Sequence, residues 1–217
     1  MKIVIQLVLW VVIGVLGYLL FNAVYGEVKF NDLKVVRYQK AVNKLKEIQK
    51  SQMAYKQITG KFAEDFDQLI AFIDTAEFVL TERRDTLVLD EEATRRYRVD
   101  TNKEITIIDT LGFRSVKDSL FQGTDRYKTM MNVPAPVADA KFEMEAGTIL
   151  KSDVPIPVFE AKVSKDILLA DQPKDYVAKE KQVVSLEGEN GAYITVGSMT
   201  DVKTAGNWPK SYGDAED

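Results

Sequence analysis

The sequence contains neither cysteine nor histidine among its 217 residues. Without cysteine the chain has no disulfide bonds, no thiolate nucleophile and no thiolate zinc ligand. Without histidine it lacks the side chain that most often carries protons at neutral pH. Glycine (12 residues) and proline (6 residues) are also scarce, so the chain is neither low in complexity nor disordered throughout. These absences exclude most familiar enzyme centres, and we predict a non-enzymatic protein with no cofactor and no metal ion.

One uninterrupted apolar run lies at the N-terminus. Residues 3–21 carry no charge, and Gln6 is their only strongly polar member. About 20 apolar residues are needed to cross the roughly 30 Å hydrocarbon core of a bilayer. Residues 1–26 are therefore predicted to form a transmembrane anchor in membrane lipid. The anchor residues are Ile3, Leu7, Trp10, Ile13, Leu16 and Leu20. The alternative is a secretory signal cleaved after Gly26.

Residues 27–60 are predicted to form an amphipathic helical stalk. No glycine or proline interrupts residues 28–59, and Gly60 provides a stop signal. Apolar and tyrosine side chains recur along one face at the spacing of three and four that is typical of an amphipathic helix. These stripe residues are Tyr38, Ala41, Leu45, Ile48 and Tyr55. The sequence leaves open whether the stripe packs within the chain or forms a homo-oligomer interface.

Charge is divided unevenly along the chain. Residues 28–61 hold nine Lys/Arg and two Asp/Glu, a balance of +7, whereas residues 62–217 hold nineteen and thirty, a balance of −11. The basic stalk can solvate its outer face, bind anionic lipid headgroups, or meet the acidic head of another copy. The acidic head has no basic patch with interleaved aromatic residues, so no nucleic acid is expected as a partner.

Residues 61–217 are predicted to form an α+β head with a polar tail from about residue 200. The expected elements are a short helix over 63–78, strands at 85–90, 97–99, 105–108 and 113–121, an edge strand that begins after Pro157, and a hairpin over 182–197 with Asn190-Gly191 at its turn. The predicted fold class is α+β, in which one transmembrane helix continues into a long amphipathic helix and is followed by a β-rich antiparallel head.

Acidic and basic clusters are the only candidates for binding chemistry. The acidic residues at 64–67 and 90–92 lack the spacing of a calcium-binding loop, so we interpret them as helix caps and solvated surface. Arg83-Arg84 and the arginines at 95–98 suit a solvated face better than an anion site. We assign no catalytic, cofactor-binding or metal-binding residue.

A resemblance to a known family rests on the stretch from Ala41 to Ile73, AVNKLKEIQKSQMAYKQITGKFAEDFDQLIAFI. It resembles type IV pilins and type II secretion pseudopilins, in which the amphipathic helix ends in a tyrosine, a short polar step and a glycine before a leucine-bearing second helix. The matching positions are Tyr55, Gly60 and Leu69. The resemblance covers about the first 75 residues. The rest of the head is similar to bacterial envelope proteins with no assigned function.

The start of the chain departs from the pilin pattern. The sequence MKIVIQLVLW has neither the glycine at which prepilin peptidase cuts nor the helix glutamate, and Gln6 is its only polar substitute. The resemblance therefore implies a pilin-like protein that stays in the membrane.

The resemblance implies a membrane-anchored, pilin-like (pseudopilin-like) structural or assembly subunit of a bacterial cell-envelope protein secretion or transport machine. Its expected partners are other envelope proteins and a second copy bound through the stalk. It also implies a single-pass protein of the inner (cytoplasmic) membrane with a periplasmic head. The excess of Lys and Arg after the apolar run favours a cytoplasmic head instead. The alternative function is a membrane-tethered periplasmic binding module for a ligand or client protein.

Overall fold

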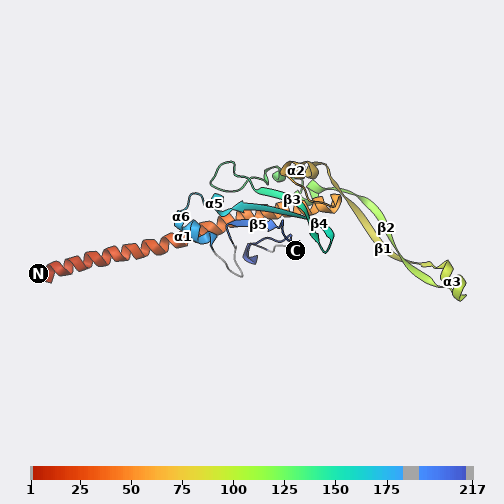
Figure 1. Ribbon diagram of the computed structural model, residues 1–217, viewed down its shortest axis with the longest axis horizontal. Helices are drawn as coiled ribbons and strands as arrows, with labels where there is room; N and C mark the ends of the chain where they lie inside the picture. Colours follow the sequence, from red (N-terminus) through yellow and green to blue (C-terminus); the bar gives the residue numbers. More distant parts are fainter. Residues whose placement is uncertain (1, 183–190, 214–217) are drawn as a thin grey trace.

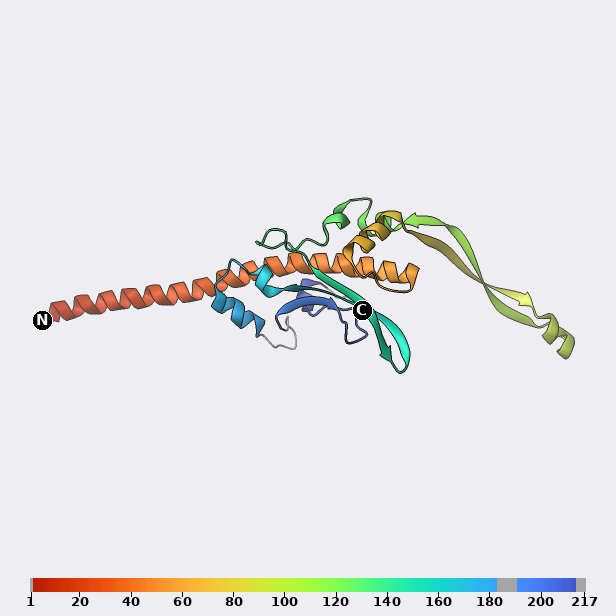
Figure 2. The same cartoon turned by 45° about the horizontal axis from the view of Figure 1, so that its top comes forward.

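The protein consists of one very long helix, a head packed around its second half, and a projecting hairpin (Figure 1). The computed structural model describes residues 2–182 and 191–213. Helix α1 spans Lys2–Thr59, and its first half extends from the head as a free rod in Figure 1 and Figure 2. At 1.5 Å per residue its 58 residues are about 87 Å long. Gly60 ends the helix with a φ of +79°, and its N–H donates to the Lys56 carbonyl at 2.8 Å.

The other elements are shorter. They are α2 (Phe66–Thr75), β1 (Glu77–Leu89), α3 (Glu91–Tyr97), β2 (Asn102–Ser115), α4 (Val116–Phe121), the 3-10 helix η1 (Arg126–Thr129), β3 (Glu143–Lys151), β4 (Val154–Ser164), α5 (Lys165–Leu168), α6 (Lys174–Lys181), β5 (Tyr193–Gly197) and the 3-10 helix η2 (Lys210–Tyr212). The strands form two antiparallel sheets, β1–β2 and β3–β4–β5. The predicted α+β class is confirmed.

The second half of α1 is the centre of the hydrophobic core. It packs against β4, β5, α2 and α4. The Phe62 ring lies 4.6 Å from the Phe159 ring between centroids, so the chain that leaves α1 packs on β4. Each large apolar side chain buried in this way stabilises the fold by roughly 1.5–3 kcal/mol. The long helix is therefore part of the head rather than a separate support for it.

A buried glutamine fixes the turn that leaves α1. The side chain of Gln52 is fully buried; its Nε2 donates to the Ala63 carbonyl and its Oε1 accepts from the Ala63 N–H, both at 2.9 Å. A buried amide is destabilising unless its donors and acceptors are paired. These two hydrogen bonds explain a polar side chain in the apolar stripe, and they direct the chain towards α2.

Strand β4 is the central strand of its sheet, which corrects the prediction of an edge strand beginning after Pro157. Pro155 and Pro157 lie inside β4, opposite Leu150 and Thr148 of β3. Among the described residues, pairing between β4 and β5 is confined to Glu160–Ser164. Proline has no N–H to donate to a neighbouring strand. Both prolines are compatible with β4 because, in the described part of the chain, only β3 flanks this part of the strand.

Two segments predicted as strands contain helices instead. Strand β2 ends at Ser115, and α4 follows at once with Val116 and Phe121 buried on one side. Tyr97 is the last residue of α3, and Arg98 ends that helix in the left-handed conformation with a φ of 55°. The predicted hairpin over 182–197 falls partly outside the described residues. Its final segment forms β5, which pairs with β4.

Strands β1 and β2 form a two-stranded ribbon with α3 at its tip, and we call residues 77–115 the arm. The arm leaves the head at the end opposite the start of α1 in both ribbon views (Figure 2). Its register runs from Glu77 opposite Ser115 to Leu89 opposite Asn102, with one bulge near the base. At about 3.4 Å per residue, the 13 residues of β1 span roughly 44 Å. The molecule therefore has an apolar helix at one end and the arm at the other.

Candidate interaction surface

The N-terminal part of α1 is free of the head. Within residues 2–182 and 191–213, α1 alone is long and apolar enough to cross a membrane, and none of its most apolar window is buried by the rest of the chain. The predicted anchor residues are all exposed there: Ile3, Leu7, Trp10, Ile13, Leu16 and Leu20. A signal sequence has the same properties. The structure thus establishes an apolar helix that can serve as a single membrane span or as a signal sequence.

The predicted stalk stripe is covered by the chain's own head. Tyr38, Ala41, Leu45 and Ile48 have no exposed surface. Tyr55 is half-buried, and its ring lies 4.8 Å from that of Phe72 in α2. These side chains pack within one chain, so a contact between copies through α1 would have to use its other faces.

The basic stalk meets the acidic head within the same chain. Arg37 of α1 donates to the Asp171 carboxylate from both terminal guanidinium nitrogens, at 2.5 and 2.7 Å, and also donates to the Leu168 carbonyl at 2.8 Å. Such paired hydrogen bonds are the strongest type between these groups. They hold the pKa of Asp171 well below its usual range and raise the pKa of Arg37. This clamp fixes the segment between α5 and α6 to α1.

A second ionic contact lies nearer the N-terminal end of α1. Glu180 of α6 accepts from Lys34 at 3.0 Å and lies 3.6 Å from the ammonium group of Lys165. Lys165 is fully buried and also donates to the Glu180 carbonyl at 3.1 Å. Buried charges persist only when they are paired and hydrogen-bonded. Opposite charges that are separated along the sequence are thus joined within one head.

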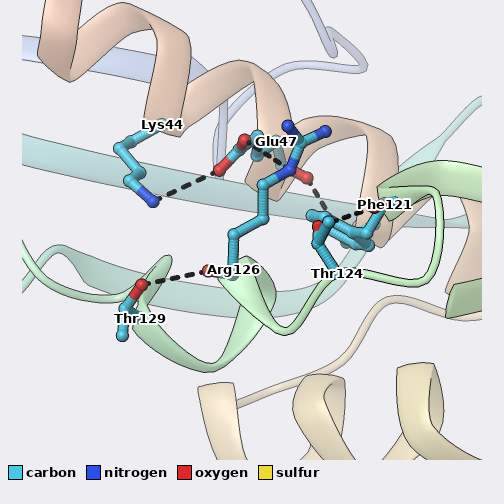
Figure 3. Close-up of polar contacts among 7 residues, drawn as sticks. Lys44, Glu47, Phe121, Thr124, Arg126 and Thr129 are labelled. Carbon is cyan, nitrogen blue, oxygen red and sulfur yellow. Dashed lines mark hydrogen bonds and ion pairs between the residues drawn. The ribbon is translucent and has the colours of Figure 1, made fainter.

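Glu47 of α1 joins the helix to the segment after α4 (Figure 3). Its carboxylate lies 3.4 Å from Lys44 and 3.3 Å from Arg126 of η1. The Arg126 guanidinium also lies over the Phe121 ring, 5.5 Å from its centroid, while Thr124 donates to the Phe121 carbonyl at 2.6 Å. Partly exposed pairs of this kind contribute less than about 1 kcal/mol each. The cluster orients η1 on α1, and its geometry accounts for no chemical step.

The arm exposes apolar side chains on both of its faces. Side chains alternate along a strand, so Leu87 and Ile108 share one face and Leu80 and Ile107 share the other. The exposed large apolar residues of the arm are Val79, Leu80, Leu87, Val88, Leu89, Tyr97, Val99, Ile107, Ile108, Leu111 and Phe113. A two-stranded hairpin alone is only marginally stable in water, and clustered exposed apolar groups mark interaction sites. The arm is the strongest candidate for an interaction surface in the described residues.

Ion pairs occupy the middle of the arm. Arg84 of β1 lies 2.5 Å from Asp109 of β2, and Arg83 lies 3.5 Å from Asp85. These side chains are exposed, which suits the predicted solvated face. The arginines at 95 and 96 lie in the last turn of α3, where cations are favourable. The arginine clusters thus have partners or roles within the arm.

An open groove of about 660 Å³ lies at the base of the arm. Its lining includes Met53 and Ala54 of α1, Phe78 of β1 and Leu120 of α4, together with the cationic side chains of Lys50 and Lys56. Among the described residues no group of three or more acidic side chains is placed to hold a metal ion. The groove offers apolar contact with two positive charges beside it.

The acidic clusters contain helix caps. Asp65 accepts from the Gln68 N–H at 2.7 Å at the start of α2, and Asp90 accepts from the Glu92 and Ala93 N–H groups at the start of α3.

The arm was not predicted from the sequence, because the sequence suggested separate short strands. The available signal was the absence of proline from residues 77–115.

No family model, curated protein or solved structure matches the chain.

Proposed function

We propose that this protein is a membrane-anchored, pilin-like structural subunit of a bacterial envelope secretion or transport machine, and that it is not an enzyme. The observation that carries the proposal is the arm, whose exposed apolar side chains lie at the end of the molecule opposite the apolar helix. In this arrangement the N-terminal part of α1 lies in the inner membrane, the head with the rest of α1 lies in the periplasm, and the arm extends outward to bind other envelope components.

Two features support an assembly role. The order of a long apolar helix followed by an antiparallel β-rich region agrees with pilin-like topology. The stalk stripe is buried within the chain, and Arg37 clamps the head to α1, so the head has little freedom to move along the helix. A head that is fixed rigidly on α1 would hold the exposed apolar arm at a constant distance from the membrane. This arrangement suits a protein that binds partners at that distance.

The groove at the arm base favours a second candidate, a tethered binding module. Its volume of about 660 Å³ is in the range of small-molecule sites, and its lining is largely apolar. In that case the ligand or client protein would bind beside Phe78, and the arm would be secondary.

Shortening the arm tests the assembly role. Thr81 and Thr110 lie opposite each other, so replacing residues 82–109 by Asn-Gly closes the ribbon with a two-residue turn. We expect the full chain to form large complexes in mild detergent and the shortened protein to be absent from them, as measured by size-exclusion chromatography with light scattering. The control, Leu150→Ser, removes an equally exposed apolar side chain from the β3–β4 hairpin and should leave the complexes intact. Unchanged complexes after arm shortening would refute the proposal.

Orientation is tested with single cysteines, because the chain has none of its own. Ser211 and Thr110 are exposed and suit the purpose. Labelling of Ser211→Cys and Thr110→Cys by an impermeant maleimide, once the outer membrane alone is permeabilised, is the expected result. Labelling only after the inner membrane is lysed would place the head in the cytoplasm and overturn the periplasmic assignment.

A further inference from the structure

The two long edges of the arm are the starting point. Strands β1 and β2 pair only with each other among the described residues, so each has an outer edge of unpaired N–H and C=O groups. Natural proteins block such edges with prolines, bulges, short strands or charged side chains. The arm has no proline, and its one bulge lies near the base, between Leu80 and Thr81. Among the described residues, charged side chains are therefore the only such device along most of the two edges.

A membrane anchor restricts how two copies can meet, and this step rests on the proposed function. Copies held in one membrane by α1 point the same way, so their arms lie side by side with the tips together. The outer edge of β2 then meets the outer edge of β1 in the neighbouring copy, and these strands run antiparallel. Antiparallel pairing of β2 with a second β2 would place the two apolar helices at opposite ends of the pair, as the positions of α1 and the arm in Figure 1 indicate.

The charges on the arm discriminate between registers. Within one arm Glu82 lies opposite Asp109. At equal height two arms would repeat this juxtaposition across the new contact, with like charges facing each other. A displacement by two residues in one direction would place Asp85 opposite Glu104, again like charges. Like charges directly opposite are destabilising in an antiparallel sheet.

The opposite displacement, about 7 Å along the strand, gives complementary pairs. Asp109 then faces Arg84 of the neighbouring copy, and Lys103 faces the neighbour's Asp90. Arg84 and Asp109 already pair within each arm at 2.5 Å. In this register, Arg84 of each β1 and Asp109 of each β2 therefore alternate in sign from strand to strand across neighbouring copies. A stagger of this kind is expected when tilted hairpins lie side by side.

Apolar contacts agree with this register. In the displaced arrangement Ile107 lies opposite Thr86 of the neighbour, and Ile105 lies opposite the neighbour's Val88. Such β-branched pairs are favourable across antiparallel strands. Ile107 is 42% exposed and Val88 43% exposed in the single chain, so both have surface to bury.

We propose that the arm binds a second copy of this chain, with β2 of one copy adding to β1 of the next to form a continuous antiparallel sheet. The contact is heterologous, because two different surfaces meet: the edge of β2 in one copy and the edge of β1 in the next. It therefore propagates from copy to copy instead of stopping at a dimer. The sheet stands above the membrane at the level of the arms, and the apolar faces of the hairpins become continuous surfaces.

Cysteine cross-linking tests the register in the full-length protein. Two differently tagged chains, one with Thr86→Cys and one with Ile107→Cys, are co-expressed and mildly oxidised in isolated membranes. We expect a mixed disulfide-linked dimer, several-fold more abundant than with Arg84→Cys and Ile107→Cys, which reports the equal-height register. Leu87→Cys paired with Ile107→Cys is the matched control and should give no dimer, because these side chains lie on opposite faces.

Three results would overturn the inference: no dimer above the opposite-face control, stronger linking from the Arg84→Cys pair, or an equally strong dimer from Ile107→Cys alone. Folding of each variant is checked by the fluorescence of Trp208, which is buried in the head. If complexes depend on the arm but the Thr86→Cys link is absent, the arm binds another protein; the inference then fails while the proposed function stands. If arm shortening changes no complex, the proposed function fails first.

Discussion

The head buries its large apolar side chains, whereas the arm exposes them to solvent. In the head, the side chains of α1 that face β4, β5 and α2 are sealed from solvent; Leu45 and Ile48 have no exposed surface. In the arm, Leu87 is 68% exposed and Phe113 is 66% exposed. Both regions carry similar proportions of large apolar residues, but only the head brings them together in one core.

This difference indicates where each region obtains its stability. Burial within the chain stabilises the head by itself, whereas a hairpin that is apolar on both faces gains most of its stability when another surface covers it. The head is thus stable through its own packing, and the arm is expected to gain stability when a binding partner covers it. The two regions are therefore expected to respond independently to substitution.

The largest expected effect comes from a core leucine. Leu45→Ala removes a fully buried side chain and should lower the free energy of unfolding by about 2–5 kcal/mol. Leu87→Ala makes the same chemical change on the arm and should alter it by less than about 0.5 kcal/mol. Urea unfolding of the full chain in detergent, followed by Trp208 fluorescence, measures both. A loss for Leu87→Ala as large as that for Leu45→Ala would show that the arm is part of the head's cooperative unit.

The same contrast explains what the sequence could predict. The stripe of Tyr38, Ala41, Leu45 and Ile48 has the period of a helix, and the α+β class follows from it and from the alternating segments after Thr81. Local signals were sufficient there because each one agrees with the final packing. The same stripe could not show which chain covers it, since a seam within the chain and an interface between copies require the same apolar period.

The arm was harder to predict because its sequence lacks a clean alternation. Charged residues from Glu82 to Asp85 interrupt the apolar pattern of β1, and Arg84 meets Asp109 of β2 only once the two strands are in register. The long-range pairing of Glu77 with Ser115 is a property of the ribbon, not of either segment alone. The prolines led to a wrong prediction for β4. Pro155 and Pro157 suggested an edge position, but the strand lies at the centre of its sheet.

Helix caps provide a comparison of intermediate size. Asp65 caps α2 in the head and Asp90 caps α3 at the arm tip, each through backbone N–H groups of the first turn. Asp65→Ala should lower the global free energy of unfolding by about 1 kcal/mol. Asp90→Ala should leave the urea midpoint unchanged and accelerate hydrogen exchange only in the tip, because local opening there does not require the head to unfold.

The matched controls for the caps are Asp65→Asn and Asp90→Asn, since asparagine caps a helix nearly as well as aspartate. Both should behave like the unmodified protein. Slower exchange in the tip on addition of purified full-length protein would agree with an arm that is completed by binding. A global loss in Asp90→Ala equal to that in Asp65→Ala would contradict the separation of the two regions.

The smallest expected effect concerns pH and the clamp between α1 and the head. Arg37 holds the pKa of Asp171 below the roughly 3.9 of an aspartate in an unfolded chain. The stabilisation from this pair is therefore fully present above about pH 4, and it is lost as the pH falls through the lower pKa of the folded state. Because the Asp171 side chain is 46% exposed, its contribution is below about 1 kcal/mol.

Asp171→Asn should therefore lower the urea midpoint slightly at pH 7, and its deficit relative to the unmodified protein should shrink steadily below pH 4. Arg37→Gln removes the cause of the pKa shift, so adding Asp171→Asn to it should change the acid profile no further. A deficit that persisted unchanged to pH 2 would mean that Asp171 acts through its packing and not through its charge. The head would then be held on α1 by apolar burial and the Glu180 contact, and its contrast with the uncovered arm would be sharper still.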